Sequence, residues 1–178
     1  MPSLHDLNID DEKLVVRHLE PLIERAPFIA KRVAVKRPFQ SCEDLIQAIE
    51  EELHALGTEQ KITLFRAHPE LAPDNPLTMT EASQGEQARL GLTDEVSSYK
   101  ELLDALNKQY TETHGFPFIT ALVRHPNMES VLKEFEARLQ ETTEAETQRA
   151  LKEVAAVSSE RVRRTFAVVN ATDSLGVK

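Results

Sequence analysis

The chain has 178 residues, of which 40% are hydrophobic and 29% charged, as is typical of a globular protein with one hydrophobic core. Its formal net charge of −9 argues against a nucleic-acid-binding surface, because phosphate binding requires clustered lysines and arginines. A single cysteine, Cys42, excludes an intrachain disulfide and a Cys-x-x-Cys metal or redox motif.

The two ends of the sequence show no targeting signal. The opening "MPSLHDLNIDDEK" is acidic and lacks the apolar run of a secretory signal. No apolar stretch approaches the roughly 20 residues that cross a bilayer, and the final "SLGVK" is not a peroxisomal address of the Ser-Lys-Leu type. We therefore expect a cytoplasmic protein without membrane contact, and leave open import into peroxisomes by another route.

The first half of the chain has helical spacing of apolar residues. Between positions 14 and 23 the pattern is interrupted by Pro21, which predicts two short helices joined there. Ser41 precedes "CEDLIQAIEEELHAL", in which leucine and isoleucine recur every three or four residues. Ser41 is a good N-cap and Gly57 a good helix terminator, so the sequence predicts an amphipathic helix between them.

The next predicted helix begins with Thr58 as its N-cap and ends near His68, because a residue before proline disfavours the α conformation. The stretch "APDNPLT" that follows Pro69 is typical of a loop. Helix is expected again in "ASQGEQARLGL", residues 82–92, and ends at Gly91.

In the second half, Thr93 is the expected N-cap of a longer helix closed by Gly115, followed by the tight apolar connector "GFPFI". Asn127 is the expected N-cap of another helix, and Thr143 with Glu146 suggests a capping box for the last one. The pattern predicts an all-α fold of seven to nine helices. We expect one compact domain over residues 1–178, with a core from about 10 to 168 and a flexible tail from 169 to 178.

The common motifs of cofactor chemistry are missing from the sequence. There is no His-Glu-x-x-His, no glycine-rich phosphate loop and no Gly-x-Ser-x-Gly elbow, and the six histidines lack metal-ligand spacing. We therefore expect neither a metal nor a nucleotide cofactor.

One pair of residues suggests acid–base chemistry. His68 stands at a helix end fixed by Pro69, and Glu86 could meet it from a neighbouring helix. Imidazole changes protonation near neutral pH, and a carboxylate can orient it or support its charged form. Spacing alone favours an ordinary histidine at a helix end over a catalytic one, and Ser83 and Arg161 could equally be surface residues.

Several longer segments together resemble one enzyme family. They are "LEPLIERAPFIAKRV", "RPF", "LFRAHPELA", "SQGEQARLGL", "LNKQYTETHGFPFI" and "ALKEVAAVSSERVRRTF". In this order they resemble the decarboxylases of 2-oxo-4-hydroxy-4-carboxy-5-ureidoimidazoline (OHCU) in urate breakdown. The resemblance runs from about residue 14 to residue 166.

The resemblance implies an all-helical enzyme, usually a homodimer, that converts OHCU to (S)-allantoin and carbon dioxide without a cofactor. His68 would be the catalytic acid and Glu86 the second catalytic group. Arg161 would bind an anionic part of the substrate. The other residues implied to border the substrate are Pro69, Ser83, Gln84, Gly85, Gln87, Phe118, Ile119, Thr120, Ala121 and Leu122.

The sequence also departs from the family pattern. Phe28 stands where tryptophan is common, His114 replaces a residue that is often aromatic, and "VRHPNM" at residues 123–128 replaces the usual Gly followed by Lys or Arg. This loop places Arg124 and His125 beside the expected pocket. Two alternatives therefore stay open, namely an enzyme acting on a different ring carboxylate and a non-catalytic interaction protein with the same fold.

Overall fold

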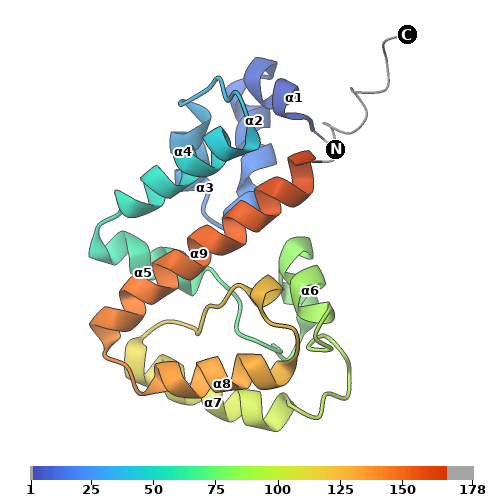
Figure 1. Ribbon diagram of the computed structural model, residues 1–178, viewed down its shortest axis with the longest axis vertical. Coiled ribbons are helices and arrows are strands. Elements are labelled where there is room, and N and C mark those ends of the chain that lie inside the picture. Colours follow the sequence, from blue (N-terminus) through green and yellow to red (C-terminus); the bar gives the residue numbers. More distant parts are fainter. Residues whose placement is uncertain (1, 168–178) are drawn as a thin grey trace. The chain divides into compact units, whose positions relative to one another are not determined.

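The computed structural model describes residues 2–167, and the predicted tail at 169–178 lies outside the described residues. Within this range the chain forms nine α-helices and three short 3-10 helices, with no strand, which confirms the predicted all-α fold (Figure 1). The α-helices are α1 (Leu4–Ile9), α2 (Glu12–Leu19), α3 (Pro27–Ala34), α4 (Cys42–His54), α5 (Thr58–Arg66), α6 (Glu81–Ala88), α7 (Lys100–His114), α8 (Met128–Leu139) and α9 (Thr143–Phe166). The 3-10 helices are η1 (Glu20–Leu22), η2 (Pro76–Thr78) and η3 (Leu122–Arg124).

The chain divides into two compact units. The first unit is Met1–Leu56 with Ala155–Lys178, and the second is Gly57–Val154, so α9 contributes residues to both. The expectation of one domain over residues 1–178 stays a prediction. None of the helices in the described range is long and apolar enough to cross a membrane.

In the first unit, α3 packs against both α2 and α4. Helix α2 ends at Leu19 and the chain continues as η1, which contains Pro21, so the predicted break at this proline is confirmed. The Ser41 hydroxyl accepts a hydrogen bond from the backbone N–H of Asp44 at 3.1 Å, as an N-cap residue does.

The second unit contains α5 to α8 and the first half of α9, with α7 packed along α8 (Figure 1). Its core is aromatic: the rings of Phe118 and Phe135 stack with centroids 3.9 Å apart, and Tyr110 meets both rings edge-on. Each aromatic pair adds about 1 kcal/mol to the free energy gained by burying its area. Phe118 lies in the middle of the connector between α7 and α8 (residues 115–122), so this core fixes the middle of the connector.

Three predicted helix starts are wrong. Gly57, not Thr58, is the N-cap of α5. Helix α9 is capped by the Thr142 hydroxyl, which accepts from Ala145 N–H at 3.1 Å, while the Glu146 side chain bonds to Arg138 and Tyr110 instead of closing a capping box.

The third error concerns α7, which begins at Lys100 and not after Thr93. Residues 92–99 form turns, in which the Ser97 hydroxyl accepts a hydrogen bond from the N–H of Tyr99. Serine and aspartate side chains compete in this way with the backbone bonds of a helix. The predicted end of α6 at Gly91 is also wrong, because this helix ends at Ala88, three residues earlier.

Candidate functional site

His68 lies two residues after the end of α5, with only 8% of its surface exposed. Its ring Nδ1 is 3.0 Å from the carbonyl oxygen of Leu64. A carbonyl oxygen only accepts hydrogen bonds, so Nδ1 carries a proton and donates it. While this bond is kept, the ring can exchange a proton only through Nε2. Pro69, the next residue, is half-buried, and the predicted helix end before it is confirmed.

Helix α6 carries the five polar or small residues that the family resemblance singles out. Ser83 and Gln87 are buried and lie four residues apart, on the same face of the helix. Gln84 and Glu86 are half-buried, whereas Gly85 is exposed. A Cβ atom at Gly85 would meet no atom within 4 Å, so the fold itself does not require glycine here.

Gln87 holds the loop that follows His68, which we call the His68 loop (residues 68–72). Its amide oxygen accepts a hydrogen bond from the N–H of Ala72 at 2.8 Å, and its amide nitrogen donates to the carbonyl of Glu70 at 2.9 Å. Ala72 has a φ of +50°, a left-handed conformation that costs a non-glycine residue about 1–2 kcal/mol. The Lys100 ammonium donates to the Ala72 carbonyl at 2.8 Å. Gln87 thus supports the backbone next to His68.

The connector between α7 and α8, residues 115–122, is held by side chains from other helices. Arg138 of α8 donates from Nη1 to the Ile119 carbonyl at 2.7 Å, and its guanidinium lies over the Phe118 ring, 4.5 Å from the centroid. Arg89, just after α6, donates to the Leu122 carbonyl. Helix α6 and its following residue therefore contact both the His68 loop and the connector.

The carboxylate of Glu153, on α9, holds the connector near its C-terminal end. Its Oε2 accepts a hydrogen bond from the Ala121 N–H at 2.9 Å. Its Oε1 accepts from Arg149 Nε at 2.9 Å and from Arg124 Nη2. Glu153 is 3% exposed, so this is a buried carboxylate with two positive partners.

The hydrogen bonds of the connector leave a defined set of backbone groups unused. The carbonyls of Ile119 and Leu122 have partners, whereas the N–H groups of Ile119, Thr120 and Leu122 have none within residues 2–167. The Thr120 carbonyl is likewise unpaired in this range. All of these residues are buried. Buried N–H groups are nearly always hydrogen-bonded, so the unpaired groups of residues 119–122 are suited to a polar ligand. The N–H groups of Phe116 and Phe118, earlier in the connector, also lack a partner in this range.

The loop that departs from the family pattern is bound into the protein. His125 is buried, with Nδ1 2.8 Å from the Ser130 hydroxyl and Nε2 2.7 Å from a Glu134 carboxylate oxygen. Burial alone would raise the pKa of Glu134, but the charge of Arg138, a hydrogen bond from Thr120 and the nearby His125 and Arg124 outweigh it and hold that pKa below its usual value. The loop's charged side chains thus face protein partners.

Arg161 lies in the first unit and forms a buried ion pair. Its Nη1 donates to Glu24 Oε2 at 2.8 Å and to the Pro21 carbonyl at 3.0 Å, and the two charged side chains are 5% and 1% exposed. Glu24 has a φ of +51°. A strained backbone that carries a buried charge is often found at functional sites.

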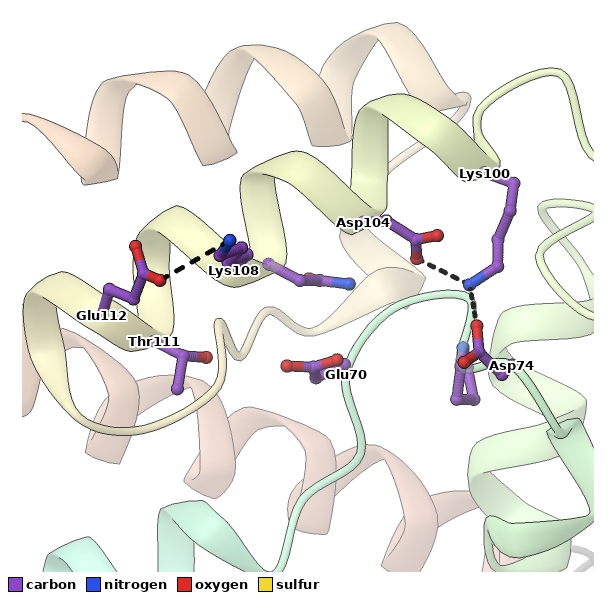
Figure 2. Close-up of a pocket in the computed structure, with 9 residues that line it drawn as sticks. Glu70, Asp74, Lys100, Asp104, Lys108, Thr111 and Glu112 are labelled. Carbon is purple, nitrogen blue, oxygen red and sulfur yellow. Dashed lines mark hydrogen bonds and ion pairs between the residues drawn. The ribbon is translucent and has the colours of Figure 1, made fainter.

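A separate pocket of about 420 Å³ lies along α7 (Figure 2). Figure 2 shows Lys100 reaching Asp74 and Asp104, and Lys108 reaching Glu112. Four carboxylates and two ammonium groups line it, which disfavours an anionic ligand. None of the residues predicted for the site lines this pocket. Among the described residues no cluster of three or more His, Cys, Asp or Glu could hold a metal ion.

The sequence reasoning missed Glu24, Arg89 and Glu153. Glu153 had a usable signal: Glu146 and Glu153 are seven residues apart, on the same face of α9 as the buried Ala150. An acid on an apolar helix face must find a positive partner or hydrogen-bond donors. Glu24 and Arg89 carry no comparable pattern, because their partners are distant in the sequence.

Comparison with known proteins identifies the family. The family model described as OHCU decarboxylase matches residues 8–163. The chain is 31% identical to the OHCU decarboxylase of Haloferax volcanii, covering 92% of this chain and 96% of that protein, and 36% identical to that of Mus musculus, covering 79% and 80%. Its fold matches a crystal structure of OHCU decarboxylase in the presence of (S)-allantoin, with a TM-score of 0.69, 17% identity, and coverage of 88% of this chain and 99% of that one. The chain belongs to the OHCU decarboxylase family.

Proposed function

We propose that the protein decarboxylates OHCU to (S)-allantoin and carbon dioxide in urate degradation, with His68 and Glu86 as its catalytic residues. The observation that carries the proposal is that the family match at residues 8–163 includes every residue proposed for the site. The protein is accordingly a carbon–carbon lyase.

The reaction is feasible without a cofactor because the substrate contains its own electron acceptor. The bond to the departing carboxylate lies next to a ring C=N, which takes up the electron pair as carbon dioxide leaves. Protonation of a ring carbon from one face then gives the S product. The protein must hold the carboxylate out of the ring plane, stabilise the enol-like intermediate and control that proton.

His68 is the proposed acid. Its Nδ1–H is engaged by the Leu64 carbonyl, so a proton would be delivered from Nε2. Glu86 would act opposite the imidazole, either orienting it or handling a second proton. Ser83 and the neighbouring α6 residues Gln84 and Gly85 would border the substrate.

The connector supports recognition of the ring. The unpaired N–H groups of Ile119, Thr120 and Leu122, together with the Thr120 carbonyl, complement a cyclic urea, which presents carbonyl oxygens and an N–H. Donors aimed at an oxygen that gains charge as the carboxylate leaves would stabilise the enol-like intermediate.

Two proposed residues have additional structural roles. Gln87 uses both ends of its amide on the His68 loop, so its contribution to substrate binding would be to position His68 and Pro69. Arg161 would bind an anionic group of the substrate, with Glu24 fixing its guanidinium. We also propose a homodimer, from the family, and a cytoplasmic location, from the lack of a targeting signal in the sequence. Light scattering of the purified protein would test the dimer.

The two alternative functions have less support. A different ring carboxylate as substrate was suggested by the "VRHPNM" loop, yet Arg124 and His125 bind Glu153 and Glu134. Loss of catalysis would be expected to remove the constraint on His68, Ser83 and Glu86, all of which are retained.

The test generates OHCU from urate in place and follows the circular dichroism of (S)-allantoin with wild-type protein, His68→Asn and the control His54→Asn. His54 is exposed on α4. Rapid formation of optically active product by wild type and His54→Asn, lost in His68→Asn, supports the proposal. Racemic allantoin at the background rate with folded wild-type protein rejects this substrate.

A further inference from the structure

We infer that Glu153 is a positioning residue for the reaction: its buried carboxylate sets the orientation of the connector whose backbone groups receive the substrate. The inference rests on the proposed function. Glu153 belongs to none of the segments proposed to border the substrate, and it acts through Ala121, to which it is bonded at 2.9 Å.

The bond to Ala121 determines which connector groups are left for a ligand. The Ala121 N–H is taken up by Glu153, whereas the N–H groups on either side of it, those of Thr120 and Leu122, have no partner in the described part of the chain. Peptide groups are planar and joined by two soft torsions per residue, so fixing the Ala121 peptide restricts both neighbours. Glu153 therefore preorganises donors that it does not touch.

The ion pairs around Glu153 do not by themselves explain its burial. Arg124 and Arg149 are 45% and 44% exposed at the side chain, and both also reach Glu134, at 3.9 Å and 3.0 Å. These two arginines could form ion pairs with carboxylates at the protein surface, and such pairs would not require a carboxylate to be removed from water. Glu153 in contrast accepts the hydrogen bond of the Ala121 N–H, in a residue that is 1% exposed.

The three side chains that hold the connector differ in whether they donate or accept a hydrogen bond. Arg138 and Arg89 donate to the carbonyls of Ile119 and Leu122, and Glu153 accepts from an N–H. The two arginines could be exchanged for other donors, because a carbonyl accepts from any of them. Glu153 is the only one of the three that accepts. A glutamine in its place has a single acceptor oxygen, so it cannot accept from the Ala121 N–H and from the two arginines on separate oxygens as the carboxylate does.

The test compares Glu153→Gln with Leu151→Ala, a matched control. Leu151 is buried on the same helix and has no hydrogen bond to the connector, and its truncation lowers stability. Four quantities are measured at a temperature where all variants are folded: kcat and KM for OHCU, the dissociation constant of (S)-allantoin, and the hydrogen-exchange rate of the Ala121 amide.

If Glu153 positions the connector, Glu153→Gln lowers kcat/KM by about tenfold or more, as expected for one misplaced hydrogen bond to a charged or reacting group. It also weakens (S)-allantoin binding and accelerates Ala121 exchange. Leu151→Ala changes kcat/KM by less than about threefold. A second variant, Arg149→Gln, keeps the bond to Ala121 and is expected to stay within about threefold of wild type.

The outcomes separate this inference from the proposed function. Wild-type protein that turns over OHCU, together with a folded Glu153→Gln that matches it in kcat/KM and in Ala121 exchange, overturns the inference alone. Equal losses of kcat/KM in Glu153→Gln and Leu151→Ala also overturn it, since the effect would then follow stability. Wild-type protein that does not accelerate the reaction overturns the proposed function and the inference with it. If Glu153→Gln does not fold, a loss of kcat/KM in Glu153→Asp that exceeds the Leu151→Ala loss supports the inference, and an equal loss overturns it.

Discussion

Replacing Gln87 by leucine is predicted to release the His68 loop while leaving the fold intact. Leucine has nearly the same volume as glutamine but provides no hydrogen bond. The Ala72 N–H, in a residue that is 2% exposed, would lose its acceptor, and the Glu70 carbonyl would lose its donor.

The magnitude follows from the two bonds and the strained backbone. A buried N–H without a partner costs about 1–3 kcal/mol, and the Glu70 carbonyl, on an exposed residue, costs less because water reaches it. Relaxation of the left-handed φ of Ala72 would recover up to about 1–2 kcal/mol of this loss. The free energy of unfolding should therefore fall by about 1 kcal/mol, and the structural change should be greatest in the His68 loop.

Urea unfolding, Ala72 amide exchange and OHCU turnover test this reasoning, with Gln148→Leu as the control because Gln148 is exposed on α9. We expect faster Ala72 exchange and a fall of kcat/KM of at least about tenfold in Gln87→Leu, with neither change in Gln148→Leu. An unfolding free energy within about 0.5 kcal/mol of wild type, together with unchanged Ala72 exchange, would refute the proposed support of the loop by Gln87.

Three further predictions concern titratable side chains. Burial lowers the pKa of His114 below 6.5, so its stabilising contribution is complete above that pH and is lost as the pH falls toward the folded-state pKa; Tm measured from pH 7.5 to 5 should fall less in His114→Phe than in wild type. Glu24→Gln removes one buried ion-pair partner of Arg161 and should lower the unfolding free energy by about 3 kcal/mol while raising KM, and an unchanged KM would contradict the proposed role of Arg161. Partial burial raises the pKa of the Cys42 thiol, so iodoacetamide at pH 7 should alkylate native protein more slowly than urea-unfolded protein, as read by mass spectrometry.

Local sequence was sufficient for the helices whose ends depend on their own residues. Ser41 and Asn127 cap their helices as predicted, because the capping side chain bonds to a backbone N–H three residues later. Thr93 failed as a cap because the turn residues after it, including Ser97, satisfy backbone groups in a non-helical form. Glu146 failed as a capping residue because a tertiary ion pair with Arg138 stabilises it more than the helix end would.

The residues of the candidate site also divide into those suggested by the sequence and those whose roles depend on tertiary contacts. His68 was predicted as a site residue from the proline next to it and from the family resemblance. The roles of Gln87 and Glu153 are set by contacts with backbone groups 15 and 32 residues away, and no spacing rule relates these positions. Burial of a polar residue can be predicted from the sequence more readily than the backbone amide or carbonyl to which that residue bonds.

The turn segment between α6 and α7 is expected to tolerate insertion. Both loops of the site are held from α6 and the residue after it, by Gln87 and Arg89, before the chain enters residues 92–99. Within this segment Val96 is 92% exposed. Exposed turns accept added residues readily, because a longer loop costs little entropy. A fluorescent or affinity tag inserted beside Val96 would therefore sit close in sequence to the site without replacing any residue that supports it, which makes this segment a position for labelling the working enzyme.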